Sequence, residues 1–319
     1  MVNLTTMKTK FYYFFIALIA LVLTACTGDT NDLNSENTGR LSVRLTDAPF
    51  PFELVAEANV TIFKVDARIA SDEYDDSDES DKNDDDDDEN DDGDGGKSFV
   101  TLMEEEIEVN LLDLTNGTTE QLADLELPAG SYDLVRVFMK GVNVVLTDGR
   151  VFDLKVPSGE QTGVKVFIKP ALNIISGLSS DLLLDFDVSR SFVVRGNIKR
   201  VEGINGFIFK PVIKASNMST AGTLAGNVST LQEEMEVALE GAQISVMAAD
   251  TLNTTAFTDA DGNYTILGLE EGQYSVFAEL EGFNSSDTLE VQINAANITV
   301  QDFVLEAEET AETDSQSGN

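Results

Sequence analysis

Apolar and polar residues alternate along most of the chain with the two-residue period of β-strands. In RLSVRL, for example, Leu41, Val43 and Leu45 fall on one face. The same kind of segment recurs at 133–140, 163–168, 181–188 and 206–213, separated by clusters of Gly, Pro, Asn and Ser. Short strands at this spacing predict an all-β fold of two β-sandwich-like domains. A helical turn or two is expected only in TTEQLADL, residues 118–125.

The second half repeats the strand pattern with clear turn signals. Ala242, Ile244 and Val246 alternate on one face, and TDADGNY (258–264) is expected to be a hairpin turn. GLEEGQY (268–274) predicts a further turn. The turn residues are Asp259 and Asp261, and the aromatic residues here are expected in the core rather than as a sugar-binding platform: Tyr264, Tyr274, Phe277 and Phe283.

An acidic insert interrupts the first domain at residues 71–97. Between positions 72 and 94 it carries 16 acidic residues against the one base Lys82, and it has almost nothing apolar to bury. We therefore expect a disordered loop between two neighbouring strands. Calcium binding by Asp88 and Asp92 is the alternative, but Phe99 stands where an EF-hand loop needs its bidentate Glu.

The N-terminus has the layout of a secretory signal. Two lysines precede an apolar run over residues 11–23, which is too short to span a bilayer comfortably. Leu23-Thr24-Ala25-Cys26 resembles the lipobox of bacterial lipoproteins, and Cys26 is the single cysteine of the 319 residues. The interpretation is a signal peptide at 1–25, a lipid anchor on Cys26, and a flexible tether at 26–38. By resemblance to lipoprotein sorting rules, Thr27 favours the outer membrane, in a periplasmic or surface-facing orientation.

The amino-acid composition excludes several kinds of catalytic, metal-binding and ligand-binding site. The chain has no histidine, which excludes a Ser-His-Asp triad and histidine-ligated metal sites, and no tryptophan, the commonest sugar-stacking residue. The formal net charge is −38, and residues 215–319 contain 19 acids but no lysine or arginine. Such a surface is a poor partner for nucleic acid, while divalent cations and basic partners remain open.

Carboxylates beside apolar runs are the remaining candidates for chemistry. Asp185 and Asp187 have the spacing that puts both on one face of a strand, but Leu183 shares that face. Asp113 and Asp47 are comparable acids. The structural interpretation is that they cap turns or face solvent at strand ends. The alternatives are a calcium or ligand contact and, through Asp113, Asp185 or Asp187, a carboxylate-dependent hydrolase.

Residues 39–215 resemble the family catalogued as domain of unknown function 4382, found in bacterial envelope lipoproteins. The segments that carry this resemblance are LTDAP (45–49), VNLLDLTNGTTEQLADLELPAGSYDLVRV (109–137), DGRVFDLKVPSGEQTGVKV (148–166), LLLDFDVSRSFV (182–193) and FKPVI (209–213). Residues 221–306 resemble carboxypeptidase regulatory-like modules of the transthyretin-like β-sandwich, followed by a polar tail at 307–319. The resemblance implies an envelope location and no established activity.

The sequence thus predicts a non-catalytic envelope lipoprotein that acts as a binding or structural and adhesive module at the outer membrane. Its expected partners are the membrane, through Cys26, and either glycans or envelope proteins, but not nucleic acid. No cofactor is expected apart from the calcium alternative. Carbohydrate binding is the alternative function, ahead of hydrolysis.

Overall fold

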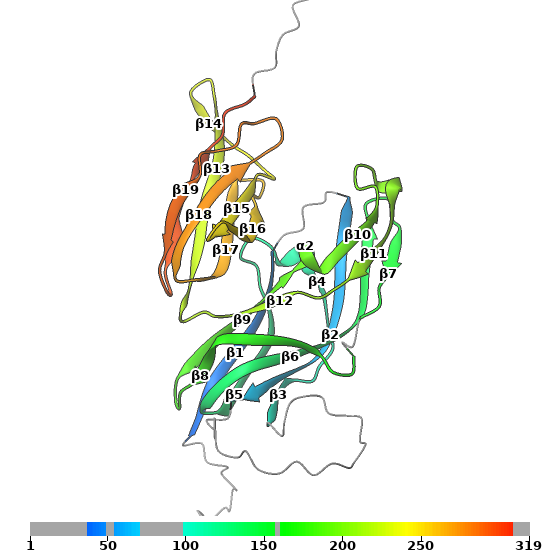
Figure 1. The fold of residues 1–319 in the computed structure, drawn as a ribbon, viewed down its shortest axis with the longest axis vertical. Coiled ribbons are helices and arrows are strands. Elements are labelled where there is room, and N and C mark those ends of the chain that lie inside the picture. Colours follow the sequence, from blue (N-terminus) through cyan, green and yellow to red (C-terminus); the bar gives the residue numbers. More distant parts are fainter. Residues whose placement is uncertain (1–36, 49–53, 71–97, 157–159, 309–319) are drawn as a thin grey trace, which may run out of the picture. The chain divides into compact units, whose positions relative to one another are not determined.

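A computed structural model of the chain (Figure 1) describes residues 37–48, 54–70, 98–156 and 160–308. Residues Asn37–Asn319 form one compact unit. Cys26, the tether up to residue 36, and the acidic insert with Asp88 and Asp92 lie outside the described residues. Within the described part, no helix has the length and apolar content needed to cross a membrane.

The first half of the chain forms one large β-sheet, which confirms the all-β prediction for this region. Its strand order is β3-β2-β6-β8-β12-β9-β1-β5, with β4 paired to β2 and β7 paired to β6. The strands are β1 (Thr38–Ala48), β2 (Val55–Ile69), β3 (Phe99–Met103), β4 (Ile107–Asn110), β5 (Glu120–Pro128), β6 (Gly130–Leu146), β7 (Val151–Asp153), β8 (Val164–Ile174), β9 (Ser179–Asp187) and β12 (Ile213–Asn217).

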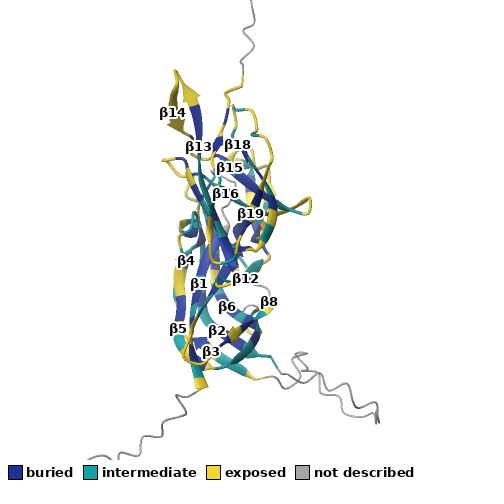
Figure 2. Cartoon of the chain, turned by 90° about the vertical axis from the view of Figure 1, so that its left-hand side faces the viewer, coloured by how far each residue is buried: buried dark blue, intermediate teal, exposed yellow. Residues whose placement is uncertain are grey.

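This sheet surrounds one hydrophobic core. The β1 side chains Leu41, Val43 and Leu45 are buried together with apolar residues from strands across the whole sheet. Because β3 and β5 stand at opposite ends of the strand order yet contact each other, the sheet curls around this core. Figure 2 shows the resulting bands of buried residues along β1, β2 and β6.

The short connecting elements sit at the ends of these strands. They are the 3₁₀ turns η2 (Leu111–Leu114) and η3 (Val201–Gly203), the single-turn helix α2 (Val188–Ser191), and the two-stranded ribbon of β10 (Phe192–Gly196) and β11 (Ile204–Phe209). The helical turn expected in TTEQLADL was wrong, because residues 120–128 form β5. That segment pairs antiparallel with β1, so the ladder with β1 overrides its weak local preference for helix.

The two segments that flank the acidic insert are neighbouring strands, as predicted. β2 ends at Ile69 and pairs antiparallel with β3, with Arg68 opposite Phe99. The insert therefore joins two adjacent strands at one end of the sheet.

The second half is a two-layer β-sandwich around its own core. One sheet contains β13 paired with β14, β17, β20 and β21, and the other has the order β16-β15-β18-β19. These strands are β13 (Ala221–Gln232), β14 (Met235–Ala238), β15 (Gln243–Ala248), β16 (Thr251–Phe257), β17 (Asn263–Glu270), β18 (Gly272–Glu279), β19 (Leu289–Ile293), β20 (Ile298–Val300) and β21 (Phe303–Val304). Ala242, Ile244 and Val246 are fully buried in this core, as predicted. Tyr264 and Tyr274 are also buried there, with exposed fractions of 1% and 6%.

The turn in TDADGNY connects two sheets instead of closing a hairpin. β16 belongs to one sheet and β17 to the other, so the expected hairpin was wrong although the turn itself is present. Oδ1 of Asp259 accepts hydrogen bonds from the backbone amides of Asp261 and Asn263, and Gly262 has a φ of 77°. These are the interactions of a side-chain-capped turn.

Candidate functional site

Strand β8 presents a short stripe of exposed side chains to solvent. Its residues alternate between buried Val166 and Ile168 and outward-facing Lys165, Phe167 and Lys169. Phe167 is 55% exposed. The Lys169 ammonium lies 5.7 Å from the centre of the Phe167 ring, a cation–π distance.

This stripe forms one wall of a groove with a volume of about 580 Å³. The volume falls in the range of small-molecule binding sites. Four cationic side chains line the groove with one carboxylate, and polar and apolar groups complete it: Lys165, Lys169, Arg190, Lys214, Glu270, Phe167, Ser216, Leu252 and Asn253.

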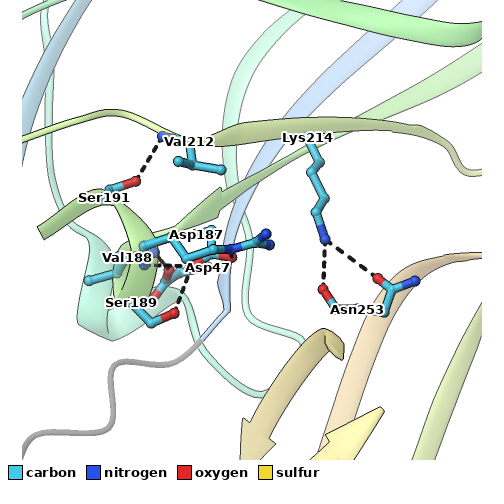
Figure 3. A network of polar contacts seen from close by, with 9 residues as sticks. Asp47, Asp187, Val188, Ser189, Ser191, Val212, Lys214 and Asn253 are labelled. Atoms are coloured by element: carbon cyan, nitrogen blue, oxygen red, sulfur yellow. Dashed lines mark hydrogen bonds and ion pairs between the residues drawn. The ribbon is translucent and has the colours of Figure 1, made fainter. Parts of the chain in front are cut away.

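Lys214 on β12 is held firmly in this groove (Figure 3). Its Nζ donates hydrogen bonds to the backbone oxygen of Asn253 at 2.8 Å and to the Oδ1 atom of Asn253 at 3.4 Å. Lys214 stands opposite Asp185 in the β9–β12 ladder. Burial lowers the pKa of Lys214, and the charge of Asp185 opposes this shift.

Asp187 caps the helix α2 beside the groove. Its Oδ1 atom accepts hydrogen bonds from the Ser189 hydroxyl at 2.8 Å and from the backbone amide of Arg190 at 2.9 Å. Its Oδ2 atom pairs with the Arg190 guanidinium. At the end of the same helix, the Ser191 hydroxyl accepts a hydrogen bond from the amide of Val212. Asp187 therefore fixes the position of Arg190, and the cap explains why one helical turn forms here.

Asp47 is a deeply buried candidate carboxylate on β1. It is 6% exposed, and its Oδ1 atom accepts one hydrogen bond, from the backbone amide of Val188 at 3.1 Å. Its Oδ2 atom has no hydrogen-bond partner among the described residues. Burial raises the pKa of Asp47 well above its usual range, and the charges of Asp185 and Asp187 add to the shift.

The space beside Asp47 is small. Asp47 and Asp185 both line a cavity of about 20 Å³, enclosed by residues such as Thr46, Asn116 and Thr265. Such a volume holds about one water molecule. It leaves no room for a sugar residue next to these two carboxylates.

The structure distributes the predicted acids over several places. Asp113 is exposed on η2, Asp187 caps α2, and Asp185 lies on β9 opposite Lys214. Leu183, which shares the face of Asp185 and Asp187, is buried against Gly268 of the second sandwich, so this face is covered. Within the described ranges, no group of three acidic, Cys or His residues is arranged to hold a metal ion. Calcium binding by Asp88 and Asp92 stays a prediction, because both lie outside those ranges.

Sequence reasoning missed the basic groove. The segment GVKVFIKP was identified only as a strand. From Lys165 on, every second residue of this segment is Lys, Phe and Lys in turn, so these three side chains fall on the same face of the strand. An outward-facing Phe between two lysines was the available signal. The opposite wall was not predictable, because Asn253 and Glu270 come from distant parts of the chain.

Comparison with known proteins identifies two regions. The model of the "Domain of unknown function (DUF4382)" matches residues 38–211, and that of the "Carboxypeptidase regulatory-like domain" matches residues 223–306. Both agree with the resemblances seen in the sequence. No curated protein matches the chain.

Solved structures that match the chain include two pilins and the Bacillus anthracis TIE protein. The Bacillus anthracis TIE protein is 12% identical, with a TM-score of 0.24, and the match covers 85% of this chain and 34% of that one. The minor pilin GBS52 of Streptococcus agalactiae is 10% identical, with a TM-score of 0.27, over 86% of this chain and 99% of that one. The shaft pilin SpaA of Lactobacillus rhamnosus GG is 10% identical, with a TM-score of 0.26, over 86% and 99%. These scores are too low for the likeness to carry any argument about this chain.

Proposed function

The chain belongs to the family defined by the domain of unknown function DUF4382, and on that premise we propose that it is a non-catalytic, lipid-anchored binding protein of the bacterial cell envelope. The observation that carries the binding role is the groove of about 580 Å³ beside β8. Its wall is built on paired strands, so its side chains are held on a rigid scaffold, as binding sites require.

The arrangement of the acids supports binding over hydrolysis. A glycosidase needs two carboxylates that flank a bound sugar about 5–9.5 Å apart. The space shared by Asp47 and Asp185 is about the size of one water molecule. Asp187 is engaged with the guanidinium and the backbone amide of Arg190 and with the Ser189 hydroxyl. Asp113 is exposed on a separate turn.

Glycan binding is favoured among the possible binding roles by one feature, the exposed Phe167. A flat aromatic ring on a groove wall offers an apolar face to a sugar ring. Ser216 and Asn253 line the same groove and supply side-chain groups that can exchange hydrogen bonds with hydroxyls. A structural or adhesive role with an envelope protein as partner is the remaining interpretation.

The location rests on the sequence alone. A diacylated Cys26 would hold the protein at the membrane, since each buried CH₂ group contributes about 0.8 kcal/mol. Labelling cells with radioactive palmitate tests this directly. The wild-type protein should be labelled and found in the outer-membrane fraction, and Cys26→Ala should lose both properties. A labelled Cys26→Ala variant would refute the anchor.

A polysaccharide screen tests the binding role. The purified full-length protein in detergent is exposed to immobilised neutral and acidic polysaccharides, once with calcium and once with a chelator. Specific retention that Phe167→Ala abolishes is the expected result. Retention of no polysaccharide under either condition would contradict glycan binding and leave a protein partner as the function to test. Retention only with calcium would assign a role to carboxylates instead.

A further inference from the structure

The ribbon of β10 and β11 has one buried face and one face in solvent (Figure 1). Phe192, Phe207 and Phe209 of its inner face belong to the hydrophobic core. On the outer face Val193 stands opposite Ile208 in the antiparallel ladder, and these side chains are 43% and 41% exposed. Two aliphatic side chains therefore lie side by side in solvent, where burial under a partner would be favourable.

Positive charges surround this aliphatic pair. Arg195 and Lys210 each come two positions after a member of the pair, so both belong to the outer face. Lys199 and Arg200 lie in the exposed connection between the two strands. Residues 192–210 contain these four bases and a single acid. Among the residues that the structure describes, none of the four basic side chains has a partner in an ion pair.

The outer face of the ribbon fits an acidic protein surface. Its exposed apolar side chains are aliphatic, whereas single-stranded nucleic acids stack their bases on aromatic rings, and the rings of this ribbon are buried. An anionic lipid surface has the right charge, but it repels a protein whose net charge is −38. A protein patch that combines carboxylates with exposed apolar side chains complements both the charge and the aliphatic pair.

The chain itself presents such a patch on its second sandwich. The last residues of β13 pair with β14 in a hairpin, and all eight residues from 231 to 238 are exposed (Figure 2). Residues 215–319 contain no lysine or arginine that could neutralise its charge. The hairpin combines three apolar side chains with three glutamates: Leu231, Met235, Val237, Glu233, Glu234 and Glu236. Ribbon and hairpin are both exposed in the same chain, so each is free to contact another copy.

We propose that the basic ribbon of one chain, residues 192–210, binds the acidic hairpin of a second copy, residues 229–238. Arg195 and Lys210 pair with the glutamates of the hairpin, and the aliphatic pair packs against its exposed apolar side chains. A contact between two different surfaces leaves one ribbon and one hairpin free in a dimer, so further copies add to form a ring or a filament. The contact does not involve the groove beside β8 and is independent of the proposed glycan binding.

Sedimentation velocity of the full-length protein in a non-ionic detergent measures this self-association, over a range of protein concentrations at low and at high salt. Arg195→Glu/Lys210→Glu makes the ribbon acidic, and Glu234→Lys/Glu236→Lys makes the hairpin basic. Glu271→Lys/Glu281→Lys is the matched control, because it reverses the charge of two exposed glutamates of the same sandwich outside the hairpin. Thermal unfolding of each variant checks that the fold is retained.

We expect the wild type to form larger species as its concentration rises and to lose them at high salt, which screens the charges. Each of the two interface variants should self-associate at least about tenfold more weakly, because like charges then face each other, and the control should behave as the wild type. An equimolar mixture of the two interface variants should associate again, since the acidic ribbon of one variant meets the basic hairpin of the other.

A wild type that stays monomeric at every concentration would overturn the proposal, and so would interface variants that associate as the wild type does. Weakened association in both variants without recovery in their mixture would overturn the pairing of ribbon with hairpin. An equal loss in the Glu271→Lys/Glu281→Lys control would reduce the effect to net charge and overturn the site. Binding of the Cys26→Ala protein to vesicles of anionic phospholipid, lost when Arg195 and Lys210 are reversed, would assign the ribbon to lipid instead of a second copy.

Discussion

Replacing the buried Asp47 by asparagine should make the protein more stable at neutral pH. Asp47 is 6% exposed, and only one of its two carboxylate oxygens is hydrogen-bonded within the described residues. Asparagine keeps the acceptor for the amide of Val188 and carries no charge. The substitution therefore preserves the hydrogen bond with Val188 and removes the free-energy cost of burying a negative charge.

The magnitude follows from the negative charge of this buried carboxylate, since the amide group of asparagine would occupy the position of the same unpartnered oxygen. A buried polar group without a partner costs about 1–3 kcal/mol, and a charged one costs more. A gain of about 1 kcal/mol raises Tm by about 2–4 °C in a domain of about 150–250 residues. We therefore expect Asp47→Asn to raise Tm by about 2–12 °C at neutral pH.

The pH dependence of this gain has a defined sign. The folded-state pKa of Asp47 is raised above the unfolded value, which is about 3.9 for a free aspartate. Below that value the carboxyl is neutral in both states, so wild type and Asp47→Asn should have similar stability. As pH rises, the unfolded state ionises first and the wild type loses stability until the folded pKa is passed. The advantage of Asp47→Asn should therefore grow from acidic to neutral pH.

Calorimetry of the two proteins between about pH 4 and pH 8 measures this difference. Asp113→Asn is the control, since Asp113 is exposed and its replacement removes the same negative charge. The control should leave Tm nearly unchanged at every pH. A lower Tm for Asp47→Asn at neutral pH, or a difference that does not vary with pH, would refute the reasoning.

Two further changes test the packing of the second sandwich, again by calorimetry. Gly226→Ala should destabilise it by about 1–3 kcal/mol or more, because an added Cβ would overlap the carbonyl of Gln301 and lie 2.8 Å from the ring of Tyr264. Gly272→Ala is the matched control with an open site, and an equal effect of both would contradict the argument. Tyr264→Phe should cost about 1 kcal/mol, because the hydroxyl of this buried residue donates to the carbonyl of Gln301 at 2.5 Å; an unchanged Tm would contradict that role.

Alternation predicted the core face well in the first part of β1. Leu41, Val43 and Leu45 are buried there, whereas Ser42 and Arg44 between them are only half-buried. In β6 the alternating pattern predicts one buried and one exposed face, and this was only partly right. Leu134 and Val135 point to opposite faces, and both are fully buried. A central strand covered on both faces loses its alternation, so the period no longer distinguishes its two sides.

The errors came from partners that are distant in sequence. Residues 120–128 form a strand because β1 pairs with them, and the turn at Asp259 joins two sheets because β16 and β17 pair elsewhere. The spacing of Asp185 and Asp187 correctly placed them on one face of a strand. That Leu183 on the same face is covered by the second sandwich could not be predicted, because the covering residue Gly268 is distant in sequence. The groove combines Phe167 with residues about 85–100 positions later, and no local pattern connects them.

The proposed function is binding of a polysaccharide without cleavage of its bonds, and one experiment measures binding and cleavage together. The full-length protein is incubated with each polysaccharide that it retains, and bound polymer and new reducing ends are quantified in the same sample over many hours. We expect retention that depends on Phe167 and no increase in reducing ends. Reducing ends that accumulate with the wild type, and disappear in Asp185→Asn or Asp113→Asn, would contradict it and identify a hydrolase.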